Sequence, residues 1–83
     1  MKYEWIEADW RKHEGLCYFE TGKNKEWRVT VWESPSGGYD ITVHFRRAYQ
    51  VLKYPIRVSW MLVGQARDQA EELFEEIKSS IND

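Results

Sequence analysis

The chain has few of the residues from which metal centres and cofactor sites are usually built. Its 83 residues include one cysteine, Cys17, and two histidines, His13 and His44. A single cysteine excludes an intramolecular disulfide framework, and this set is too small for a zinc cluster. Gly37 and Gly38 indicate only a turn, and no phosphate-binding loop or dinucleotide-binding fingerprint is present. We therefore expect neither a metal nor a cofactor.

Candidate catalytic groups are equally scarce. Asp40 and His44 share a face of a predicted strand, but their separation of about 13 Å exceeds hydrogen-bond reach. Cys17 is expected to point inward, and a buried lone cysteine usually behaves as a small hydrophobic residue. The sequence therefore predicts a protein that is not an enzyme.

Long apolar runs are also absent. No stretch approaches the roughly 20 apolar residues of a transmembrane helix, and no charged-then-apolar leader is visible. We expect a soluble, cytoplasmic protein that folds as a single domain over residues 1–83 around one small core. Five Trp, five Tyr and three Phe partly compensate for the small size, because each aromatic side chain buries a large area.

What the sequence does contain is a strong β-hairpin pattern between Glu26 and Arg46. Two runs of strict period-two alternation flank a turn-forming cluster at residues 34–38, and both are rich in β-branched and aromatic residues. Pairing Val31 with Ile41 keeps apolar residues opposite one another along the whole hairpin. The residues predicted to share its buried face are Trp27, Val29, Val31, Ile41, Val43 and Phe45.

A strand from Leu16 to Thr21 is predicted to pair with the first strand of the hairpin. The polar turn at residues 21–25 separates the two. Placing Phe19 opposite Trp27 and Cys17 opposite Val29 would extend the buried face of the hairpin.

Two outer strands are expected as well. One is a short edge strand near Tyr3 to Glu7. The other follows a connection at residues 47–54, where alternation over residues 56–63 predicts a last strand that Gly64 ends.

From Gln65 onward the apolar period becomes that of a helix, with Gly64 as the predicted N-cap. Its apolar stripe must be buried, and the core face of the sheet is the only large apolar surface available. The sequence therefore predicts an α+β fold, in which an antiparallel sheet of about four strands forms a meander and one C-terminal helix packs on one face. The stripe consists of Ala66, Ala70, Leu73, Phe74, Ile77 and Ile81.

Charge is unevenly distributed, although the net charge is only −2. Residues 68–83 carry a net charge of −5, and residues 1–40 carry −2. The segment between them carries five bases and no acid: Arg46, Arg47, Lys53, Arg57 and Arg67. This basic segment could neutralise the phosphates of a nucleic acid, or it could simply neutralise the acidic helix.

Two surfaces are candidate sites for a protein partner, and an ordinary solvated surface is the alternative for each. On the sheet face opposite the helix, aromatic and guanidinium groups interleave as in many protein interfaces. The residues of this face are Tyr18, Arg28, Trp32, His44 and Arg46. On the helix, like charges at four-residue spacing oppose helix formation, and such carboxylates can imitate phosphates. The residues of this acidic face are Asp68, Glu71, Glu72, Glu75 and Glu76.

The segments LCYFE, EWRVTVWE, GYDITVHF and QARDQAEELFEEIKSSI together resemble short proteins of phages and mobile elements. Some proteins of this anti-CRISPR-like type inhibit host-defence nucleases. The resemblance lies in architecture and transfers no functional residue. It implies a small non-catalytic protein that occludes a larger partner.

The sequence therefore predicts a non-enzymatic protein-binding module with no membrane partner. The resemblance further implies an inhibitor of a host nuclease or nucleic-acid-binding protein. The alternative is a nucleic-acid-binding accessory protein that uses the aromatic and basic sheet face. In that case the phosphate contacts would come from Arg46, Arg47, Lys53 and Arg57.

Overall fold

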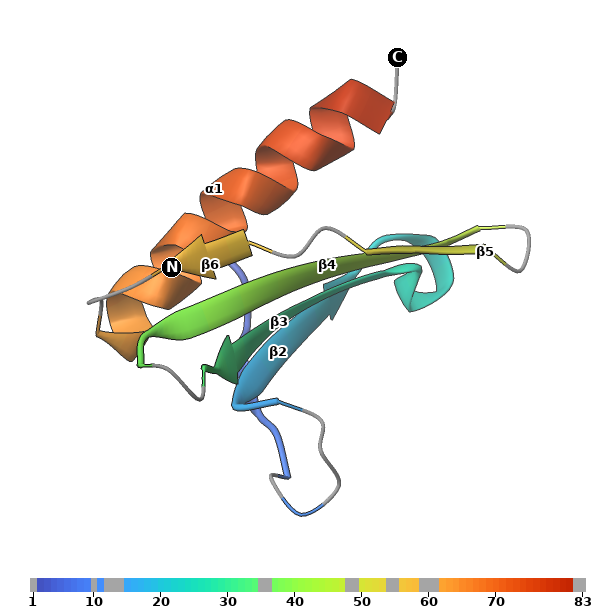
Figure 1. The fold of residues 1–83 in the computed structure, drawn as a ribbon. Helices are drawn as coiled ribbons and strands as arrows, with labels where there is room; N and C mark the ends of the chain where they lie inside the picture. Colours follow the sequence, from blue (N-terminus) through green and yellow to red (C-terminus); the bar gives the residue numbers. More distant parts are fainter. Residues whose placement is uncertain are drawn as a thin grey trace.

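The computed structural model describes residues 2–9, 11, 15–34, 37–47, 50–53, 56–58 and 62–81. It contains one antiparallel sheet with α1 lying over one of its faces, which confirms the predicted α+β meander with a C-terminal helix (Figure 1). The strands pair in the order β1-β2-β3-β4-β5, and β6 also pairs with β4. The elements are β1 (Ile6–Glu7), β2 (Cys17–Thr21), a 3-10 turn (Lys23–Lys25), β3 (Trp27–Glu33), β4 (Tyr39–Arg47), β5 (Gln50–Lys53), β6 (Ile56–Val58) and α1 (Val63–Ile81).

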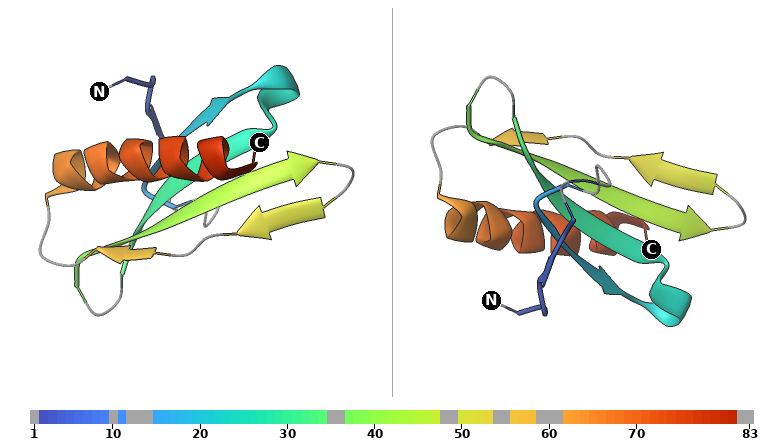
Figure 2. Two further views of the ribbon diagram at one scale, coloured as in Figure 1. Left: turned by 90° about the horizontal axis from the view of Figure 1, so that it is seen from above. Right: turned by 90° about the horizontal axis from the view of Figure 1, so that it is seen from below.

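The hairpin of β3 and β4 has the predicted register. Val31 pairs with Ile41, and the ladder continues to Trp27 and Phe45 at the other end. All six residues predicted for the buried face are buried. The helix α1 crosses the strands of the sheet at an angle (Figure 2). Alternation was sufficient here because apolar residues fall opposite one another in only one register that also matches the turn.

The predicted register of β2 is wrong by two residues. Phe19 lies opposite Val29 and Cys17 opposite Val31, so that Thr21 pairs with Trp27. The reason is the tight connection at residues 22–26, where a 3-10 turn places Asn24 at φ 58° and Lys25 at φ 53°. Because the shift is even, every side chain keeps its predicted face.

The outer edge of β4 also differs from expectation. Residues 50–53 were expected in a connection but form β5, which pairs with the end of β4 at residues 44–47. The expected last strand is shorter, since β6 covers residues 56–58 and pairs with the start of β4. Pro55, which lacks an N–H, falls between these strands in the sequence, and residues 59–61 lie outside the described residues.

The first strand is likewise shorter than expected. Only Ile6 and Glu7 form β1, which pairs with Tyr18 and Cys17 of β2. The residues before it form hydrogen bonds with the helix.

The start of α1 corrects the predicted cap. The helix begins at Val63, so Gly64 is inside it and Leu62 precedes it. The backbone N–H of Leu62 donates to Oε1 of Gln65 at 2.9 Å, and the Ala66 N–H donates to the Leu62 carbonyl at 3.0 Å. A side chain three residues into the helix thus reaches back to the cap residue, as in one half of a capping box.

Aromatic rings fill the space between the helix and the sheet. Phe74 is fully buried and meets Phe19 and Trp27 edge to face, with ring centroids 5.5 and 5.2 Å apart. Trp27 stacks in turn on Phe45 at 4.1 Å. Ala66 and Ala70, also fully buried, let the helix backbone approach the sheet. The predicted stripe is therefore confirmed where its side chains are described; that of Ile81 lies outside the described residues.

Replacing Gly64 by alanine is expected to raise the free energy of unfolding by about 0.5–1 kcal/mol. A Cβ atom at this helical position would meet no atom within 4 Å, and alanine restricts the unfolded chain more than glycine does. Urea denaturation of the variant against wild type measures the difference. A loss of stability would contradict the helical assignment of this residue.

Candidate functional site

The segment at residues 2–7 is fastened to the helix by a buried carboxylate. Glu71 is only 7% exposed and accepts three hydrogen bonds. The donors are the backbone N–H groups of Lys2 (2.8 Å) and Tyr3 (3.1 Å) and the indole N–H of Trp5 (2.8 Å). Burial alone would raise the pKa of Glu71, but these hydrogen bonds outweigh it and lower the pKa below the usual value.

Glu71 therefore does not belong to the solvated acidic face on which it was predicted. The rings of Tyr3 and Trp5 cover this side of the helix, and both pack on Phe19, at centroid distances of 4.4 and 4.8 Å. Because a buried carboxylate that satisfies three donors is not free to meet a partner, Glu71 is a structural residue.

Glu75, one turn further along, is also occupied within the fold. Its Oε1 accepts the hydroxyl of Tyr3 and lies 3.5 Å from the ammonium group of Lys2. The bond from Tyr3 lowers the pKa of Glu75, while burial and this neighbouring carboxylate raise the pKa of Tyr3 to about 12. Two of the five predicted acidic residues thus fasten the N-terminal segment.

The other three acids form an exposed row, here called the acidic column: Asp68, Glu72 and Glu76. Successive members are four residues apart, a rise of about 6 Å along the helix. No described residue forms an ion pair or a hydrogen bond with any of them. For the part of the chain that the structure describes, neutralisation of these acids by the basic segment is therefore not observed.

The base nearest to the column in sequence, Arg67, points to the other side of the helix. Its guanidinium donates to Glu7 at 2.8 Å and to the sulfur of Cys17 at 3.4 Å. Cys17 is fully buried, as predicted, and burial raises the pKa of its thiol although Arg67 opposes the shift. This thiol is shielded and protonated at neutral pH, a poor state for a nucleophile.

The sheet face opposite α1, here called the far face, carries the five residues predicted for it. The register of β2, β3 and β4 places Tyr18, Arg28, Trp32, His44 and Arg46 there together. The Arg28 guanidinium lies 3.9 Å from the centre of the Tyr18 ring, and the Trp32 indole donates to the Thr42 hydroxyl at 2.8 Å. Arg46 is exposed and the other four are half-buried.

The far face is less open than the alternation suggested. Thr30, in its centre, is 1% exposed, and Gly15 lies directly against it. A Cβ atom on Gly15 would come within 2.5 Å of the Thr30 Cγ2 and 3.3 Å of the Trp32 Cδ2. Sequence reasoning treated this glycine as part of an irregular link. The one signal in the sequence was the residue type, because glycine readily adopts a positive φ, here 91°.

The backbone positions of the bases proposed for phosphate contact are spread along β4 and the strands paired with it. Lys53 is paired with His44, and Arg57 with Asp40, so both backbone positions belong to rows of the far face. The backbone of Arg47 is paired with that of Gln50. The register thus places Lys53 near the Arg46 end of β4, whereas Arg57 is paired with Asp40, about 20 Å away along the strand.

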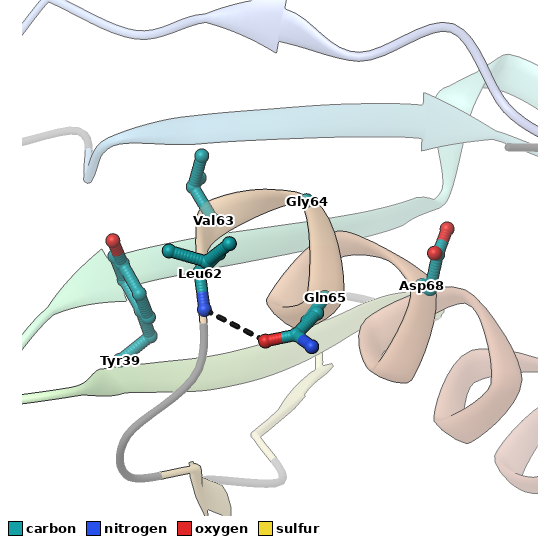
Figure 3. A pocket seen from close by; sticks show the side chains of 6 residues that line it. All are labelled: Tyr39, Leu62, Val63, Gly64, Gln65 and Asp68. Carbon is teal, nitrogen blue, oxygen red and sulfur yellow. Dashed lines mark hydrogen bonds between the residues drawn. The ribbon is translucent and has the colours of Figure 1, made fainter.

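Sequence reasoning missed an apolar notch beside the first turn of α1. It has a volume of about 710 Å³, and Leu62 at its edge is 74% exposed (Figure 3). A signal was present, because Met61 and Val63 are apolar at positions where an alternating strand would be polar. The lining residues are Tyr39, Leu62, Val63, Gly64, Gln65 and Asp68.

The described residues contain no group of three or more His, Cys, Asp or Glu side chains placed to hold a metal ion. Within the same residues, no helix combines the length and the apolarity needed to cross a lipid bilayer. Searches with family models, curated proteins and solved structures found no match to this chain.

Proposed function

We propose that the protein is a non-catalytic module that binds a basic surface of a larger protein through the acidic column. One observation carries this proposal: Asp68, Glu72 and Glu76 are exposed and have no partner among the described residues, whereas the neighbouring Glu71 and Glu75 are used inside the fold. Repulsion within such a column costs a few tenths of a kcal/mol per pair. An opposite charge on a partner would relieve that repulsion.

A row of carboxylates of this kind suits a groove that normally holds a phosphate backbone. Lysine and arginine side chains line such grooves, and complementary charge both speeds association and selects the partner. A nuclease or nucleic-acid-binding protein is the class of partner that fits best. By occupying the groove, the module would act as an inhibitor, which is what the resemblance to short phage proteins implies.

The far face supports a second candidate, a nucleic-acid-binding accessory protein. Arg28, His44 and Arg46 lie on one end of this face, and Lys53 is paired with His44 there. Stacking on Tyr18 would suit a base, but the Arg28 guanidinium already covers that ring. This occupied ring is why the acidic column is preferred.

Reversing two charges of the column, Glu72→Lys with Glu76→Lys, is expected to weaken partner binding about tenfold or more. Immobilised protein would be used to capture partners from extracts of the organism that encodes it, with and without nuclease. The same partner should bind wild type in both extracts and be lost from the variant. Circular dichroism would establish that the variant keeps its helix.

The matched control is Arg28→Ala with Arg46→Ala, which alters the far face and leaves the column intact. If the control loses binding while the reversed column keeps it, the column is not the contact. If nuclease treatment releases what is captured, the nucleic-acid candidate replaces the proposed function. A salt-sensitive mobility shift with labelled single strands would then be expected for wild type and not for the control.

A further inference from the structure

We infer that the apolar notch beside the first turn of α1 receives an apolar side chain from a basic segment of the protein partner. This inference rests on the proposed function. It adds one feature of the partner, an apolar side chain, that the acidic column alone does not specify. The partner segment would carry one Leu, Met or Phe, with lysine or arginine one and two helical turns beyond it.

The notch is apolar where a side chain would enter. Tyr39 and Val63 are half-buried and packed against the core, whereas Leu62 is 74% exposed at the rim. Figure 3 shows Leu62 between Tyr39 and the first turn of the helix, held in place by the hydrogen bond from its N–H to Gln65. Leu62, Tyr39 and Val63 thus line one concave apolar surface, and a recess of this kind suits the burial of one apolar side chain.

The charge around the notch indicates which kind of partner segment would enter it. Asp68 lines the notch and is also the first residue of the acidic column, so the apolar and acidic surfaces are continuous. None of the six lining residues is basic. Glu72 and Glu76 follow at about 6 and 12 Å along the helix. An apolar group flanked by two or three positive charges at this spacing is a property of an amphipathic protein segment, whereas nucleic acids and anionic lipids would be repelled.

Two synthetic peptides test the inference on the full chain. Each has about 18 residues, long enough for an isolated helix to form, and carries lysines at four-residue steps. One peptide has a leucine one turn before the first lysine, and the other has serine there. The leucine peptide is expected to bind about tenfold more tightly, because burial of one such side chain is worth that much in affinity. It should also shift the amide resonances of Tyr39, Leu62 and Val63.

Leu62→Ser is the informative variant. Leu62 is the residue before the helix, where serine is a preferred cap, and Gln65 already supplies the other half of a capping box. The variant should therefore keep its helix, bind both peptides equally and retain the affinity due to charge. Ile6→Ser is the control, because Ile6 is the other exposed large apolar residue among those described and lies in β1. It should leave the leucine preference unchanged.

The outcomes separate this inference from the function on which it rests. If wild type binds both peptides equally, or if the leucine preference survives Leu62→Ser, the notch is not the site that receives the apolar side chain. The proposal that the acidic column binds the partner would be unaffected. If neither peptide binds at low salt and reversal of the column does not affect capture, the proposed function fails and the inference fails with it.

Discussion

Replacing Glu71 by alanine is expected to lower the free energy of unfolding by about 2–4 kcal/mol. In wild type the carboxylate accepts hydrogen bonds from three donors at the junction of the N-terminal segment and the helix. In the variant each of these donors loses its charged acceptor. Hydration of the freed N–H groups would require the segment to leave the helix. Tyr3 and Trp5 would then give up their contacts with Phe19.

Two further variants distinguish the buried carboxylate from an ordinary surface acid. Glu71→Gln keeps an acceptor oxygen but loses the charge, so an intermediate loss is expected. Glu72→Ala removes the exposed neighbour, and its effect should lie within about 0.5 kcal/mol. Urea denaturation gives all three values, and amide exchange of Lys2 and Tyr3 reports on the segment itself. Equal losses for Glu71→Ala and Glu72→Ala would show that the segment is not fastened in this way.

The same carboxylate predicts how stability depends on pH. Because folding lowers the pKa of Glu71, its contribution is fully present above its unfolded pKa of about 4.3 and is lost as the pH falls through the folded value. Wild type should therefore lose stability in acid more steeply than Glu71→Gln. The lowered pKa of Glu75 adds a loss of the same sign to both proteins. If the free energy of unfolding of the two proteins falls equally steeply with decreasing pH, Glu71 is not the group responsible.

The contrast between Glu71 and Glu72 shows which features of this fold cannot be predicted from the sequence. Alternation and a turn signal are local, so the hairpin of β3 and β4 could be predicted together with its register. The two glutamates are adjacent in a charged run, and which of them is buried depends on residues 66–69 positions away in the chain. No periodicity within the helix encodes that contact.

The register of β2 and the notch have related explanations. The two-residue shift follows from positive φ at Asn24 and Lys25, conformations that residues other than glycine seldom adopt and that alternation does not report. The notch arises where a strand pattern runs directly into a helix pattern around Leu62. Its exposure depends on where α1 begins, and helix ends are the least predictable feature of such patterns.

Replacing Gly15 by alanine is expected to lower the free energy of unfolding by about 2–4 kcal/mol, from two separate causes. Its φ of 91° is unfavourable for any residue with a Cβ atom, at about 1–2 kcal/mol. The added methyl group would also lie 2.5 Å from the Thr30 Cγ2 and 3.2 Å from the Val31 carbonyl oxygen. Thr30 is β-branched and buried, so it cannot move aside without disturbing the sheet.

Gly37→Ala isolates the first cause, because Gly37 has a φ of 93° and a Cβ atom there would meet nothing within 4 Å. It should therefore cost only about 1–2 kcal/mol. Urea denaturation compares the two variants, and the Trp32 indole resonance should move in Gly15→Ala alone, since that ring lies against Gly15 and is held by Thr42. Equal losses with an unmoved indole would mean that Gly15 does not cover the far face. Trp32 would then be more accessible to a ligand than the packing around Thr30 indicates, and the nucleic-acid candidate would gain the surface that it otherwise lacks.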